Sequence, residues 1–217
     1  MISASTLTAP PLIHQVIGPS PEILAHILDN NTNLTVWNRQ LPLHIADFAA
    51  RLLSLDEPLS DVISFDISDE RSSVDLKCLA SRFNDLEGYE SFIVDIDWLV
   101  SAYAYLLGAK RIGLRLRALD TAMCPRFHVD HVPVRLITTY AGAGSQWLRE
   151  SVLERPQLGQ LPTEPLHDSQ IEHMDAGDVA LLKGEKWQGN EGFGLIHRSP
   201  TLSQGERRLI LTLDWLA

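Results

Sequence analysis

The hydrophobic pattern changes its period near residue 110, and this change limits which folds the chain can adopt. Between residues 89 and 107, apolar side chains recur at spacings of three and four, which is typical of a helix with one buried face. Gly108 follows, and glycine often ends a helix. From residue 112 to 118, apolar side chains instead alternate with Gly113, Arg115 and Arg117, as in a strand with one polar face. The chain is therefore expected to place helices first and strands afterwards.

The same criteria assign the remaining elements. Helix spacing of apolar residues predicts helices over 21–31, 43–55, 74–83 and 89–107, with a short β-type run at 34–37. Strands are expected over 112–118, 126–129, 134–140, 171–174, 179–183, 194–197 and 208–216, separated by turn residues. This order predicts an α+β fold in which a β-sandwich or small barrel is backed by N-terminal helices. We expect a single domain over residues 1–217, with a mainly helical support layer over 1–110 and the β-core over 111–217.

Composition excludes several classes of function. The formal net charge is −10, so the surface as a whole repels phosphate backbones, and general nucleic-acid binding is not expected. Cys78 and Cys124 are too few for a disulfide framework and fit a reducing compartment. No stretch has the roughly 18 apolar residues of a membrane span, and the first residues lack a signal-peptide pattern. We therefore expect a cytoplasmic protein that does not bind membranes.

A possible metal-binding motif, F-H-V-D-H, covers residues 127–131. On an extended strand, residues i and i+2 point to the same side, so His128 and Asp130 can reach one metal ion. His197 is the candidate for a third ligand. Two imidazoles and one carboxylate hold ferrous iron on one face and leave neighbouring positions open for substrate and dioxygen. The sequence therefore predicts a metal site in the β-rich half of the chain.

Other uses of nearby residues stay open. His131 directly follows the carboxylate and competes with it as a ligand. Cys124, His128 and His131 form a C-x3-H-x2-H pattern that zinc could bind, although it lacks the paired cysteines usual in structural zinc sites. Trp147 and Trp187 lie in expected loops, where tryptophan more often caps a core than stacks on a substrate.

From residue 126 onward, the chain resembles the core of 2-oxoglutarate- and iron(II)-dependent dioxygenases, particularly the prolyl-hydroxylase and alkylation-repair type. The matching stretches are H-V-D at 128–130, R-L-I-T-T-Y at 135–140, A-G-D-V-A-L-L-K at 176–183, G-L-I-H at 194–197 and R-L-I-L-T at 208–212. Across its full length, the chain also resembles a bacterial family known only as domain of unknown function 1826 (DUF1826). The first resemblance implies that the β-core is a double-stranded β-helix of the jelly-roll or cupin-like kind and carries the metal site.

This resemblance implies roles for single residues. His128, Asp130 and His197 match the iron ligands and would be the catalytic residues. An arginine of the last strand would bind the distal carboxylate of 2-oxoglutarate, and both Arg207 and Arg208 are available.

Strand parity favours one of these two arginines. In the resembled family, this arginine often shares the inward face of its strand with a small hydroxyl residue. Arg208 with Thr212 fits this pattern, so we choose Arg208; the opposite face, which includes Leu209 and Leu211, is apolar and is expected to pack against the N-terminal helices. Tyr140, together with its strand neighbours Thr138 and Arg135, is expected to line the co-substrate pocket.

The leading hypothesis is thus an iron(II)- and 2-oxoglutarate-dependent oxygenase that hydroxylates or demethylates an unknown small-molecule or protein substrate. The main alternative is a non-catalytic metal-binding accessory protein of zinc or iron homeostasis on the same scaffold, with zinc as the alternative metal. A third hypothesis, a cupin-like isomerase or lyase, requires a metal but neither dioxygen nor a keto acid. The sequence makes no prediction of oligomeric state.

Overall fold

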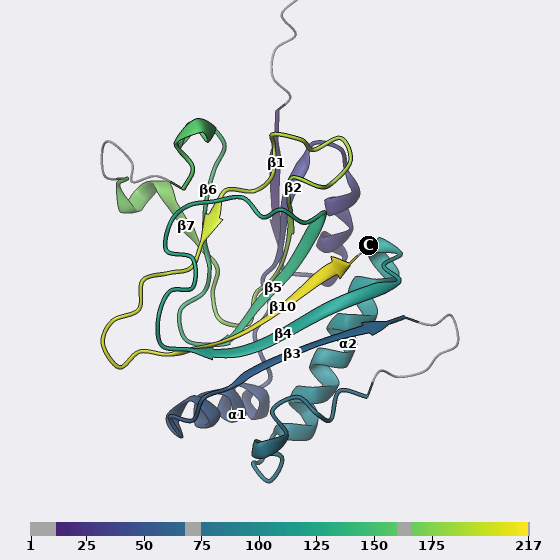
Figure 1. The fold of residues 1–217 in the computed structure, drawn as a ribbon, viewed down its shortest axis with the longest axis vertical. Helices are drawn as coiled ribbons and strands as arrows, with labels where there is room; N and C mark the ends of the chain where they lie inside the picture. Colours follow the sequence, from purple (N-terminus) through teal and green to yellow (C-terminus); the bar gives the residue numbers. More distant parts are fainter. Residues whose placement is uncertain (1–11, 68–74, 160–165, 217) are drawn as a thin grey trace, which may run out of the picture.

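The structure is a computed structural model and describes residues 12–67, 75–159 and 166–216. Helices cover one face of a large sheet, and a smaller sheet lies on the other side (Figure 1). The strands are β1 (His14–Gly18), β2 (Thr32–Trp37), β3 (Ser60–Asp66), β4 (Arg111–Leu119), β5 (Val134–Ala141), β6 (Gln146–Leu148), β7 (Ile171–His173), β8 (Val179–Lys183), β9 (His197–Arg198) and β10 (Arg208–Leu216). The helices are α1 (Leu43–Ser54) and α2 (Tyr89–Leu107), with the 3-10 helices η1 (Pro21–Leu28), η2 (Ser81–Phe83), η3 (Arg155–Gln157) and η4 (Asp168–Gln170).

The strand order brings distant parts of the sequence together. The large sheet has the order β1-β2-β8-β5-β10-β4-β3, and the small sheet has the order β7-β6-β9. All pairs are antiparallel except β1 with β2. An isolated antiparallel bridge joins His128 to His197, so the segment around His128 extends the small sheet beyond β9. The result is two facing sets of four antiparallel segments, as in a double-stranded β-helix. One set is β8-β5-β10-β4, and the other is β7-β6-β9 with the segment around His128.

One face of the large sheet packs against the helices. Leu209, Leu211 and Leu213 of β10 are fully buried in this core, which confirms the apolar phase expected for the last strand. Phe48 of α1 and Phe92 of α2 lie in the same core, with ring centroids 4.9 Å apart. Each such buried side chain contributes about 1.5–3 kcal/mol, so this layer fixes the orientation of every central strand.

The other face of the large sheet packs against the small sheet. Ile137 of β5, Ile210 of β10 and Trp147 of β6 are buried together in this second core. Because side chains alternate along a strand, the polar residues next to the helix-facing leucines also point to this side. The space between the two sheets therefore receives both apolar core residues and a set of charged side chains.

Several elements match the sequence-based predictions closely. α2, β8 and β10 have the predicted bounds, and α1 and β5 differ from them by one residue. β1, β3 and β6 were not predicted. With β2, the strands β1 and β3 give the segment before residue 110 three strands in addition to its helices. The strand predicted over 126–129 is reduced to the bridge at His128, and the one predicted over 194–197 becomes β9.

Two helix predictions need correction. The segment predicted as a helix from residue 21 forms the 3-10 helix η1. The helix predicted over 74–83 was wrong for residues 75–83, which form turns and η2, while residue 74 lies outside the described residues. Ala80 has a positive φ of 47°, and the Tyr89 hydroxyl donates to the carbonyls of Lys77 and Leu79, so other contacts replace helical hydrogen bonds. Across the described ranges, no helix is both long and apolar enough to cross a bilayer.

Candidate metal centre

His128 and His197 are placed opposite each other by backbone pairing. The amide of His128 donates to the carbonyl of His197 at 3.0 Å, and the amide of His197 donates to the carbonyl of His128 at 3.0 Å. Directly opposed residues of an antiparallel pair project their side chains to the same face. The two imidazole rings accordingly lie 4.5 Å apart between centroids. Two residues 69 positions apart in the sequence thus present their rings to one point.

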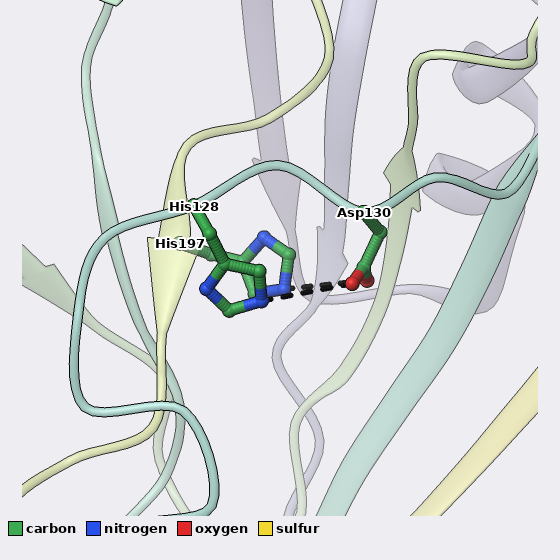
Figure 2. A group of neighbouring side chains, drawn as sticks. All are labelled: His128, Asp130 and His197. Carbon is green, nitrogen blue, oxygen red and sulfur yellow. Dashed lines mark ion pairs between the residues drawn. The ribbon is translucent and has the colours of Figure 1, made fainter. Parts of the chain in front are cut away.

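Asp130 completes the group. Its Oδ1 lies 3.6 Å from Nε2 of His128, and its Oδ2 lies 3.3 Å from Nε2 of His197. Figure 2 shows the carboxylate pointing toward the two imidazole edges. One ligand atom from each residue lies within 4.8 Å of the others, and among the described residues this is the one cluster of His, Cys, Asp and Glu with such geometry. The predicted H-x-D pair and the distant histidine are therefore brought together.

The tautomers of both histidines suit metal binding. Nδ1 of His128 donates to the Arg126 carbonyl at 3.0 Å, and Nδ1 of His197 donates to the Leu195 carbonyl at 3.1 Å. A carbonyl oxygen only accepts hydrogen bonds, so each Nδ1 carries a proton, and in the neutral form of the ring the lone pair that can bind a metal lies on Nε2. A backbone carbonyl that fixes the tautomer in this way is a common partner of metal-binding histidines. The residues present therefore fit a divalent metal with two nitrogen ligands and one oxygen ligand.

The charge state of Asp130 also suits a ligand. Burial opposes its ionisation, but hydrogen bonds from His128 and His197 and the charge of Arg135 outweigh this effect and hold the pKa of Asp130 below its usual range. Nη1 of Arg135 lies 2.7 Å from Oδ2 of Asp130. The hydrogen bond to Asp130 raises the pKa of His128, although burial opposes this shift. Asp130 is therefore an anion over the whole physiological pH range.

Two glycines, Gly184 and Gly194, allow the backbone segment that carries Asp130 to pack closely against them. A Cβ at Gly184 would lie 2.5 Å from the carbonyl oxygen of Asp130 and 2.2 Å from that of Val132. A Cβ at Gly194 would lie 2.3 Å from Cγ1 of Val129. Because contacts below 3.0 Å force atoms to move, a side chain at either position would displace the metal-binding segment.

Arg208 lies on the inner face of β10 and is almost fully buried, at 1% exposure. Its Nη2 donates to Oγ1 of Thr139 at 3.0 Å and to Oγ of Ser145 at 3.1 Å. Nε and Nη1 have no hydrogen-bond partner, and no described carboxylate forms an ion pair with this side chain. Burial lowers the pKa of Arg208 to about 10. A buried guanidinium with free donors is costly unless an anion binds it.

The other residues expected near the co-substrate are placed as follows. Arg207 points away from the inner face and donates to the Leu53 carbonyl at 3.1 Å, at the end of α1. Thr212 lies on the same face of β10 as Arg208 and lines a cavity with Arg135. Arg135, which was expected to line the co-substrate pocket, forms an ion pair with the candidate ligand Asp130.

The assignment of Tyr140 to the co-substrate pocket needs correction. Its hydroxyl donates to Oδ2 of Asp95 on α2 at 2.7 Å, and its ring packs against Phe92 in the helix-facing core. Arg135 and Tyr140 are an odd number of residues apart on β5, so their side chains point to opposite faces. Thr138 has the same parity as Tyr140 and is likewise buried. Neither residue meets the three candidate ligands.

The structure does not bring the alternative zinc ligands together. His131 and Cys124 are exposed, and neither belongs to the cluster formed by His128, Asp130 and His197. Trp147 is 3% exposed within the core between the sheets, and Trp187 packs edge-on against Trp215. Trp147 is therefore a core residue, and the partly buried Trp187 packs against the helix-facing core.

Sequence reasoning missed two residues that hold Arg208, namely Thr139 and Ser145. Thr139 belonged to a predicted strand, and strand parity would have placed it on the inner face once Arg135 was assigned there. Ser145 lies just before β6, a strand of three residues without a clear alternating pattern. No local signal pointed to its contact with Arg208, 63 residues away.

Comparisons with known proteins agree with this architecture. A family model described as "Protein of unknown function (DUF1826)" matches residues 18–214, and no curated protein matches the sequence. The structure of dioxygenase for auxin oxidation 1 from Arabidopsis thaliana, in a binary complex with 2-oxoglutarate, aligns with a TM-score of 0.51 at 9% identity, covering 94% of this chain and 92% of that chain. The rice dioxygenase for auxin oxidation aligns with a TM-score of 0.50 at 13% identity, covering 94% and 83%. At such identities the likeness shows the fold alone, and it confirms the expected α+β, double-stranded β-helix class.

Proposed function

Given that the chain belongs to the DUF1826 family of proteins of unknown function, we propose that it is an iron(II)- and 2-oxoglutarate-dependent oxygenase that hydroxylates or demethylates its substrate. One observation carries the proposal. The interior that holds the His128, Asp130 and His197 cluster also contains Arg208, a buried arginine with two free donors and no carboxylate partner. A metal-binding protein without a keto acid has no evident use for such a cation.

The ligand set favours a redox-active metal with open positions. Nε2 of each histidine and one oxygen of Asp130 would hold the ion on one face. Two imidazoles and a carboxylate are the typical set of non-haem iron(II) oxygenases, and the ion then retains sites for a chelating co-substrate and for dioxygen. Bound iron(II) would supply the redox chemistry that activates dioxygen. Arg135 would hold the second side of the carboxylate, so that Asp130 keeps one orientation.

Arg208 would bind the distal carboxylate of 2-oxoglutarate. Its free Nη1 can donate to an oxygen of this carboxylate, and the positive charge of the guanidinium strengthens that hydrogen bond; Nε, on another edge of the guanidinium, is left for a second acceptor. Thr139 and Ser145 hold Nη2 and leave these other donors available. The Arabidopsis neighbour in complex with 2-oxoglutarate supports this co-substrate through its fold.

The main alternative remains a non-catalytic metal-binding protein that holds zinc or iron in the same cluster. Metal analysis of protein purified without added metal, followed by titration with 2-oxoglutarate, separates the two. For an oxygenase, we expect 2-oxoglutarate to bind the metal-loaded protein, and Arg208→Gln to weaken that binding at least tenfold without loss of metal. Arg207→Gln is the matched control and should leave the keto-acid affinity unchanged. A zinc-loaded protein that does not bind 2-oxoglutarate would support the accessory role instead.

A further inference from the structure

A cavity lies beside the candidate metal centre on the inner face of the large sheet. Its volume is about 270 Å³, and it is lined by Arg115, Arg117, Met123, Arg135, Ile210 and Thr212. Arg135 links the cavity to the metal site, because the same guanidinium forms an ion pair with Asp130. Three of the six lining residues are arginines, which is unusual for a protein whose formal net charge is −10.

Two of these arginines are neutralised within the protein. Asp214 accepts from Nη1 of Arg115 at 2.5 Å and from Nε and Nη2 of Arg135 at 2.6 and 3.0 Å. Asp130 accepts from the remaining Nη1 of Arg135 at 2.7 Å. The charges of Arg115 and Arg135 are thus balanced by two carboxylates, through one nitrogen–oxygen contact for Arg115 and three for Arg135.

The third arginine, Arg117, has no such partner. No described carboxylate lies within 4.0 Å of its guanidinium, and its buried Nε has no hydrogen-bond partner. Within the described part of the chain, its one side-chain hydrogen bond runs from Nη1 to Sδ of Met123, at 2.9 Å. Sulfur is a weak acceptor, so this contact does not replace a carboxylate. The cavity therefore keeps one uncompensated positive charge, before any charge from a bound metal is counted.

We propose that this cavity binds the substrate, that the substrate is a small organic acid, and that Arg117 holds its carboxylate. This inference rests on the proposed function, because only an oxygenase that already uses 2-oxoglutarate as co-substrate would take a second acid as its substrate. Strand pairing places Arg117 opposite Ile210 and Arg115 opposite Thr212. The acid's charged end would meet Arg117, while Ile210 and Met123 offer apolar surface to the rest of the molecule.

The keto acid and the substrate would use different arginines. Arg208 does not line this cavity, and its partners Thr139 and Ser145 do not line it either. A volume of about 270 Å³ is just below the range of roughly 300–1,000 Å³ typical of small-molecule pockets, so the occupant is a small molecule rather than a folded partner.

The test uses zinc-loaded protein with saturating 2-oxoglutarate, so that the keto-acid site is filled. Butyrate, hexanoate, benzoate and phenylacetate are titrated by NMR, each paired with its neutral amide. We expect at least one acid to bind with a Kd below about 5 mM and its amide to bind at least tenfold more weakly. Arg117→Gln should weaken that acid at least tenfold and leave the Kd of 2-oxoglutarate unchanged. Arg111→Gln, on the same strand but outside the cavity, is the matched control.

A second pair of variants keeps Arg117 itself intact. Met123→Glu places a carboxylate beside the guanidinium and should abolish acid binding, whereas Met123→Gln should retain it. Equal binding of acid and amide, or no binding of any of the four acids at 20 mM, would overturn the proposal. Loss of 2-oxoglutarate binding in Arg117→Gln would also overturn it, because Arg117 would then belong to the keto-acid site.

Titrating 2-oxoglutarate and the acids separately into metal-loaded protein distinguishes this proposal from the function on which it rests. Arg117-dependent acid binding in a metal-loaded protein that fails to bind 2-oxoglutarate would support the acid site and reject the oxygenase. Binding of 2-oxoglutarate without binding of any acid would support the oxygenase and reject the acid site.

Discussion

His128 and His197 exchange both of their backbone hydrogen bonds, each at 3.0 Å, and this single bridge sets the spacing of the two imidazoles. Further backbone hydrogen bonds hold the same segment: the amide of Gly159 donates to the Phe127 carbonyl at 3.1 Å, and the amide of Glu185 donates to the Asp130 carbonyl at 3.0 Å. Phe127 and Ile196, next to the two histidines, are buried in a small core of their own.

Removal of either imidazole should abolish tight metal binding. With His128→Ala or His197→Ala, one nitrogen ligand is lost and we expect the metal affinity to fall by at least 100-fold, because loss of an outer partner alone typically costs about 10–100-fold. Competition with a chelator measures the affinity. His131→Ala removes the exposed neighbouring imidazole and should change nothing; a similar loss in that variant would assign a ligand role to His131.

Metal affinity should decrease as the pH falls. The hydrogen bond to Asp130 raises the pKa of His128, and a proton on Nε2 competes with the metal. Affinity measured from about pH 8 down to about pH 5.5 should therefore fall. A flat profile over this range would contradict the assigned ligand.

The metal-free protein should show the opposite pH dependence. Protonated His128 pairs with Asp130, so its contribution to the free energy of unfolding is complete below the unfolded-state pKa near 6.5. This contribution is lost as the pH rises through the higher folded-state pKa. Urea unfolding of the metal-free protein measures it, and His128→Gln should remove the dependence.

Gly184→Ala should damage the metal centre without touching a ligand. The added Cβ would lie 2.2 Å from the Val132 carbonyl and 2.5 Å from that of Asp130, and backbone atoms have to move. We expect metal affinity to fall about 10–100-fold, as for other changes that misplace a ligand. Gly113→Ala is the control, since its Cβ would meet only the flexible end of Leu216 at 3.2 Å. Equal metal affinity in the two variants would show that the Asp130 segment tolerates displacement.

Tyr140→Phe should affect stability and leave the co-substrate site intact. The variant removes a buried hydrogen bond to the Asp95 carboxylate, which corresponds to about 1.5–3 kcal/mol of the free energy of unfolding. The Kd of 2-oxoglutarate should not change, because Tyr140 lies on the helix-facing side of β5. Tyr105→Phe, at a 92% exposed position of α2, is the stability control. A raised Kd in Tyr140→Phe would restore the role predicted from sequence.

The sequence predicted the central strands and the two long helices because their apolar periods are long and regular. β10 is buried on the helix side through Leu209, Leu211 and Leu213, and this alternation is visible in the sequence. β3 was missed because it is an edge strand whose residues are exposed or only half-buried, so its alternation is weak. β6 has three residues, too few to show a period.

The site residues that could be predicted from the sequence are those that belong to a local spacing or to a family motif. The H-x-D spacing and the distant histidine identified His128, Asp130 and His197 as a cluster that the structure forms. Partners that exist only through tertiary packing had no such pattern, including Ser145 beside Arg208 and Asp214 between Arg115 and Arg135. Tyr140 shares β5 with Arg135, but an odd separation places the two side chains on opposite faces of the sheet, so the prediction for Tyr140 was wrong.

The most direct test of the proposed function is the visible absorption of the anaerobic protein with ferrous iron and 2-oxoglutarate. A keto acid that chelates iron held by His128, Asp130 and His197 should produce a weak charge-transfer band. We expect the band in the unmodified protein, at much higher 2-oxoglutarate concentrations in Arg208→Gln, and not at all in His128→Ala. Absence of the band in the unmodified protein, once its iron content has been verified, would contradict the assignment as a 2-oxoglutarate-dependent oxygenase.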